Sequence, residues 1–166
     1  MKWSGESSTD LINHIGDSYN KYLEKEISEL SRLTTIILKV HGSEHKELSK
    51  VHRIYHIIQI NLVQHILKEQ TGIFPLVKMY DRKPSKELLD EMFESINELT
   101  PFIDETKELL DELRNVTDNY TAPEDGCVTY DNTYEKLAKF ESKILEKLTL
   151  EENVLFPRLK EELSRY

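Results

Sequence analysis

The chain has 166 residues, of which 31 are acidic and 22 are basic, so its formal net charge is −9 with neutral histidines. Hydrophobic residues make up 38% and charged residues 32%, a mixture typical of long amphipathic helices and not of a disordered chain. Five glycines and five prolines leave few turns for an all-β fold, and the acidic balance argues against a nucleic-acid partner. A single cysteine and the absence of a long apolar run predict a cytoplasmic protein with no disulfide framework and no membrane segment.

Apolar residues recur in steps of three and four along four stretches of the chain. The spacing predicts helices over residues of about 9–41, 44–79, 85–117 and 127–163, within a single domain that covers 1–166. Because the connections between these helices are short, we expect an all-α fold, an up-down-up-down four-helix bundle.

Polar and breaking residues mark where the helices begin and end. Ser8, Thr9 and Asp10 are candidates for the first helix start, and Ser85 is a candidate cap for the third helix. Pro101 falls inside the third helical pattern, so we expect a kink or a restart there.

A motif of eleven residues occurs twice. It reads His65-x3-Glu69-x4-Phe74-Pro75 in the second helix and Lys147-x3-Glu151-x4-Phe156-Pro157 in the fourth, displaced by 82 positions at every element. Such self-similarity predicts two related helical hairpins packed against each other. The two glutamates are then expected at matching depths in the bundle.

Six polar residues stand on helix stripes that are otherwise apolar: Asn20, His41, His65, Glu69, Lys147 and Glu151. A buried carboxylate needs a cation or a proton, because an unpaired one costs several kcal/mol. His65 and Glu69 are four residues apart and so share one helix face, an arrangement that builds metal sites in bundle cores. The alternatives are a hydrogen-bonded core histidine and glutamates that lean out to solvent.

The chain resembles the hemerythrin-like domain of the ScdA/YtfE family of iron-centre repair proteins. The stretches that carry the resemblance are LINHI at 11–15, VHG at 40–42, HILKE at 65–69, YTAPEDGCVTY at 120–130 and LEENVLFPR at 150–158. The resemblance implies a bundle that holds two iron ions through five histidines and two bridging glutamates.

The same resemblance places four residues of this chain on ligand positions: His41, His65, Glu69 and Glu151. Three positions where the family has histidine are substituted, namely Asn20, Ile103 and Lys147. We therefore expect one metal ion in place of two, iron first, with zinc or manganese as alternatives, or no metal at all. Lys147 offers a reason for the last case, since its ammonium could lie between the carboxylates or, alternatively, extend to solvent.

Two functions follow from these expectations. The first is a metal-binding protein related to iron–sulfur cluster repair and to nitrosative and oxidative stress, without a conventional catalytic activity. The second is a metal-free regulatory or interaction module that kept the bundle. The expected partners are a metal ion and iron–sulfur proteins, with no nucleic acid and no membrane, and the chain is expected as a monomer or a homodimer. Cys127 at the start of the fourth helix is read either as a packing thiol or as a redox residue.

Overall fold

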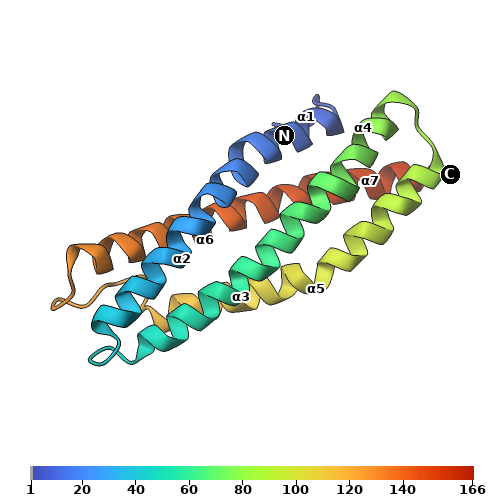
Figure 1. The fold of residues 1–166 in the computed structure, drawn as a ribbon. Coiled ribbons are helices and arrows are strands. Elements are labelled where there is room, and N and C mark those ends of the chain that lie inside the picture. Colours follow the sequence, from blue (N-terminus) through green and yellow to red (C-terminus); the bar gives the residue numbers. More distant parts are fainter. Residues whose placement is uncertain (1) are drawn as a thin grey trace.

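Four long helical rods make up the molecule, as the ribbon in Figure 1 shows. The computed structural model describes residues 2–166, and all regular structure in that part of the chain is helical. The first rod consists of α1 (Ser8–Ile15), η1 (Gly16–Asn20) and α2 (Lys21–His41), and the second of α3 (Glu47–Lys68), η2 (Glu69–Ile73) and α4 (Phe74–Arg82). The third rod is the single helix α5 (Lys86–Val116). The fourth rod consists of α6 (Val128–Leu150), η3 (Glu151–Leu155) and α7 (Phe156–Leu163). Helix α2 packs on α3 and α6, and α3 also packs on α5. The predicted all-α four-helix bundle is confirmed.

Serine side chains cap two of the rods. Ser7, one residue before the predicted start, accepts a hydrogen bond from the Asp10 backbone N–H at 3.0 Å, and the Asp10 carboxylate accepts one from the Ser7 N–H at 3.3 Å. Ser85 accepts the Leu88 N–H at 3.2 Å and caps α5 as predicted. These bonds satisfy first-turn donors that have no partner within the helix.

Three of the rods contain one π-helical turn, labelled η1, η2 and η3. In each, the N–H that follows the turn donates to the carbonyl five residues earlier: Lys21 to Gly16, Phe74 to Glu69, and Phe156 to Glu151. A proline is the second residue after each of the second and third of these turns. Proline has no N–H and collides with the carbonyl four residues before it in an α-helix, so the wider turn relieves that clash.

Pro101 does not interrupt the third rod. Helix α5 runs without a break from Lys86 to Val116, and Pro101 lies exposed inside it. Of the two predicted alternatives, a restart at this residue is wrong, and a kink stays a prediction. An exposed proline loses only one backbone hydrogen bond, and the packing of α5 on α3 holds the helix on both sides of it.

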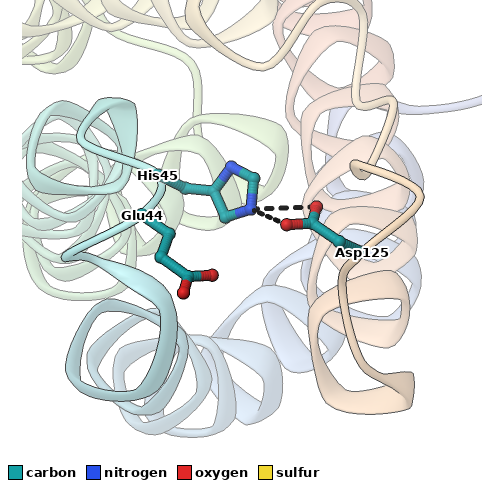
Figure 2. A group of neighbouring side chains, drawn as sticks. All are labelled: Glu44, His45 and Asp125. Carbon is teal, nitrogen blue, oxygen red and sulfur yellow. Dashed lines mark hydrogen bonds and ion pairs between the residues drawn. The ribbon is translucent and has the colours of Figure 1, made fainter.

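The loop between α5 and α6 closes one end of the bundle against the turn between α2 and α3. Asp118, Asn119 and Tyr120 have positive φ angles of 50°, 55° and 60°, and this left-handed bend turns the chain back toward α6. His45 in the opposite turn contacts Asp125 of this loop, with Nε2 3.0 Å from Oδ1 (Figure 2). No helix among residues 2–166 has the length and apolar character of a membrane span.

A single apolar core runs between the rods, and Tyr55 is one of its largest fully buried members. Its hydroxyl donates to the carbonyl of Ile27 at 2.7 Å and so joins α3 to α2.

Replacing Tyr55 by phenylalanine is expected to lower the free energy of unfolding by about 1 kcal/mol, because the buried carbonyl loses its side-chain partner. Urea denaturation followed by circular dichroism measures this loss. A Tyr55→Phe protein as stable as the wild type would show that this bond adds nothing to the packing.

Candidate functional site

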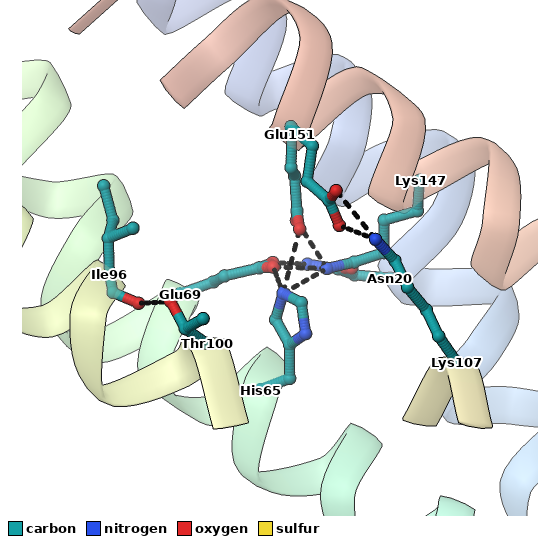
Figure 3. A network of polar contacts seen from close by, with 9 residues as sticks. Asn20, His65, Glu69, Ile96, Thr100, Lys107, Lys147 and Glu151 are labelled. Carbon is teal, nitrogen blue, oxygen red and sulfur yellow. Dashed lines mark hydrogen bonds and ion pairs between the residues drawn. The ribbon is translucent and has the colours of Figure 1, made fainter. Parts of the chain in front are cut away.

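A cluster of five polar side chains lies inside the bundle, where three rods carry their π-helical turns (Figure 3). Its members are Asn20 at the end of η1, His65 in α3, Glu69 at the start of η2, Lys147 in α6 and Glu151 at the start of η3. None is more than 4% exposed. We call these five residues the buried cluster.

Lys147 occupies the centre of the buried cluster. Its Nζ donates to Glu69 Oε1, lies 2.7 Å from Glu151 Oε1, and is 3.2 Å from His65 Nε2. The whole side chain has no exposed surface. The predicted internal ion pair is therefore what the structure shows, and the alternative of a lysine that extends to solvent is wrong.

Histidine and asparagine complete the contacts to the two carboxylates. His65 Nε2 lies 2.5 Å from Glu69 Oε1 and 3.0 Å from Glu151 Oε2. Asn20 Nδ2 donates to Glu69 Oε2 at 2.9 Å. Each carboxylate thus faces N–H donors from two or more other side chains, which offsets much of the cost of burying it.

The charges in the buried cluster set the pKa values of its members. Burial and Lys147 oppose protonation of His65, but Glu151 and Glu69 outweigh them and raise its pKa to about 9. Burial opposes ionisation of Glu69, yet the Lys147 ammonium and His65 hold the pKa of Glu69 well below its usual range. The carboxylates outweigh burial at Lys147 and raise its pKa, while burial and the nearby Glu69 raise the pKa of Glu151. Two basic groups therefore face two carboxyl groups, and the cluster is balanced without an added ion.

The two copies of the repeated motif meet at this site. His65 and Lys147 occupy equivalent places in the motif and contact each other, and so do Tyr80 and Glu162, whose side chains hydrogen-bond at 3.0 Å. When a symmetry axis relates two repeats, equivalent residues contact each other where this axis passes between them. Lys147 is thus the counterpart of His65 across this axis.

The buried cluster also contains a set of metal donors. Atoms of His65, Glu69 and Glu151 all lie within 4.8 Å of one another. The chemistry of imidazole and carboxylate suits Fe²⁺, Zn²⁺ or Mn²⁺. The N–H groups of Lys147 and Asn20 are directed at oxygens of the same carboxylates, however, and these are the oxygens that a cation would need.

His41 is not part of the buried cluster, and its prediction as a fourth ligand is wrong. Asn20 and His41 lie on one continuous rod, separated by the 21 residues of α2, which corresponds to about 30 Å along the axis. His41 Nε2 lies 3.1 Å from the Cys127 sulfur at the loop end of the bundle. Steps of three and four identify residues on one helix face but do not give their position along the helix axis. The spacing alone therefore could not show that Asn20 and His41 lie far apart.

Ile103 is buried on α5, between two residues that form ion pairs with the sequence neighbours of Glu69 and Glu151. An ion pair joins Lys68, next to Glu69, to Glu98, and another joins Lys107 to Glu152 with an N–O distance of 2.6 Å. Ile103 lies between residues 98 and 107 along α5. Its assignment as a substituted ligand position stays a prediction.

Two features of the molecule were not predicted from the sequence. The first is the π-helical turns, although a proline six residues after Glu69 and after Glu151 was a signal for two of them. The contact between His41 and Cys127 is the other, since 86 positions separate these residues. Such turns are often found at functional sites, because the extra residue redirects the side chains around it.

The chain is similar to iron–sulfur cluster repair proteins of several bacteria. Iron-sulfur cluster repair protein ScdA of Staphylococcus epidermidis is 28% identical over 149 residues, which are 90% of this chain and 65% of that protein. ScdA of Staphylococcus haemolyticus is 29% identical over 146 residues, 88% of this chain and 64% of the relative. Iron-sulfur cluster repair protein YtfE of Escherichia coli O1:K1 / APEC is 25% identical over 156 residues, covering 94% and 68%. The chain thus spans about two thirds of the length of these relatives. A sequence model described as the hemerythrin HHE cation binding domain matches residues 11–159, and the chain belongs to this family.

Proposed function

We propose that this chain is a cytoplasmic hemerythrin-family module that serves iron–sulfur cluster repair as a metal-free regulatory or protein-binding partner, with Lys147 in the place of the metal. The observation that carries the proposal is the position of the Lys147 ammonium, fully buried and in contact with both carboxylates and with His65. The link to repair rests on the relatives named ScdA and YtfE. The family and these relatives imply iron as the ion that such a bundle binds.

The residues present do not fit a two-iron centre. By the resemblance, Asn20 and Lys147 stand where histidines would bind the second iron. Both direct N–H groups at carboxylates, Asn20 to Glu69 at 2.9 Å and Lys147 to Glu151 at 2.7 Å. A protonated nitrogen has no lone pair for a metal ion, so the second iron loses its own ligands.

A single divalent ion competes with protons at this site. To bind both carboxylates and His65, it has to displace the protons of His65 and Lys147. With the pKa of His65 at about 9 and that of Lys147 above its ordinary value, this exchange weakens binding at pH 7 by about 10⁵-fold or more. This linkage supports a metal-free state at neutral pH.

Metal analysis of the purified protein tests the proposal. We expect protein made with ample iron and dialysed against a chelator to keep far less than one metal ion per chain. The double variant Asn20→His, Lys147→His is expected to retain bound iron, because it replaces two N–H donors with imidazole ligands. Wild-type protein that keeps about one iron per chain, and loses it in a His65→Ala variant, would overturn the proposal.

That result would favour the second candidate function, a mononuclear metal site on His65, Glu69 and Glu151. The observation in its favour is that these three donors lie within 4.8 Å of one another. The Oδ1 atom of Asn20 is also buried with no hydrogen-bond partner. In this case the ion would be held by the imidazole and the two carboxylates, and it would supply Lewis acidity or redox chemistry in the bundle.

A further inference from the structure

A second group of metal-binding side chains lies at the loop end of the bundle, outside the buried cluster. Two segments meet there: the turn after α2, and the loop that leads into α6. His45 Nε2 lies 3.0 Å from Asp125 Oδ1, and His41 Nε2 lies 3.1 Å from Cys127 Sγ. Both imidazole rings also contact the ring of Tyr130, with centroid distances of 5.2 Å for His41 and 5.7 Å for His45. The two histidines are thereby held against one buried aromatic side chain.

Three side chains at this end lie close together. Donor atoms of Glu44, His45 and Asp125 all lie within 4.8 Å of one another, and Figure 2 shows the contact of His45 with Asp125, with Glu44 beside it. Ligands of a tetrahedral metal ion, with bonds of about 2.0–2.2 Å, lie about 3.4 Å apart. A small movement of exposed side chains on two surface segments is enough to reach that spacing. We propose that Glu44, His45 and Asp125 bind a divalent transition-metal ion of the zinc type.

The imidazole of His45 explains why a zinc-type ion is favoured over calcium or magnesium. Imidazole is a ligand of intermediate softness that suits zinc-type ions, whereas calcium and magnesium prefer a site made of oxygen atoms alone.

This loop-end site differs from the buried cluster in its access to solvent. Glu44 and Asp125 are exposed and His45 is half-buried, whereas the buried cluster is at most 4% exposed. An ion can therefore reach the loop end without unfolding the bundle. The two sites are separated by nearly the whole length of α2, about 30 Å, so they should load independently.

Calorimetric titration of the metal-free chain with Zn²⁺ tests the proposal. We expect one ion per chain, and a loss of affinity of about tenfold or more in His45→Ala and in Asp125→Asn. His56→Ala is the matched control: His56 is a partly buried surface histidine on α3 that already bonds Ser31 at 3.2 Å, and its loss should leave the affinity unchanged. Circular dichroism checks that each variant keeps its helices.

Cys127→Ser is a second control, because Cys127 bonds His41 and is not one of the three converging donors. Its loss should leave the affinity for Zn²⁺ unchanged. A wild-type chain that takes up no Zn²⁺, or His45→Ala and Asp125→Asn variants that bind it as tightly as the wild type, would overturn the site. Neither result bears on the buried cluster, since both variants leave Lys147 and its partners intact.

Discussion

Replacing Lys147 by methionine is expected to lower the free energy of unfolding by about 3–5 kcal/mol at neutral pH. The change removes the ammonium that contacts Glu69, Glu151 and His65 but keeps a side chain of similar length. Two buried carboxyl groups then face the single positive charge of His65, and one of them has to take up a proton or lose its burial. Urea denaturation at pH 7 measures the loss.

Two further variants separate the charge effect from packing. Lys143→Met lies one turn earlier on α6, where Lys143 is 33% exposed and 3.6 Å from Glu146, and it should cost less than about 1 kcal/mol. The double variant Lys147→Met, Glu151→Gln removes the cation together with one carboxylate and should recover much of the lost stability. A Lys147→Met protein as stable as the wild type would contradict the central role of this ammonium.

The same Lys147→Met substitution also changes how easily the site can bind a cation. With the ammonium gone, His65, Glu69 and Glu151 keep their mutual spacing and lose their strongest competitor for a cation. In the folded protein the Lys147 ammonium supplies positive charge between the two buried carboxylates. Under the proposed function, this charge takes the place of a metal ion.

Periodicity was sufficient to predict the four rods and the face of each that is buried. Residues three and four apart share a helix face whatever surrounds them, and this made Asn20, Glu69 and Lys147 recognisable as inward-facing residues. The repeated motif added the depth of two of them, since equivalent positions in two related hairpins lie at the same level. Glu69 and Glu151 indeed meet the same Lys147 ammonium.

The position of a residue along the axis of one rod could not be predicted in this way. His41 shares a stripe with Asn20, yet it lies at the far end of α2 and contacts Cys127. Contacts between residues far apart in the chain, such as His45 with Asp125, depend on how a loop bends. The bend here relies on three successive left-handed residues, two of which are Asp118 and Asn119. Their tolerance of positive φ is a general property that does not specify where the loop ends.

The stability of the protein is expected to fall between about pH 6.5 and pH 9 because of His65. Its pKa is raised in the folded protein to about 9, against about 6.5 in an unfolded chain. The protonated form is therefore favoured by folding, so the contribution is fully present below pH 6.5 and is lost as the pH rises through 9. The difference corresponds to about 3 kcal/mol.

Comparison of the wild type with His65→Asn isolates this contribution from other titrating groups. The difference in unfolding free energy between the two proteins should shrink by about 3 kcal/mol from pH 6 to pH 9.5. His52→Asn is the matched control, because burial and the neighbouring His56 lower the pKa of His52, so its contribution has the opposite sign and grows as the pH rises. A wild-type minus His65→Asn difference that stays constant over this range would mean that His65 is neutral in the folded protein. Lys147 would then be the only cation between the two carboxylates, and the charge balance inferred for the buried cluster would be wrong.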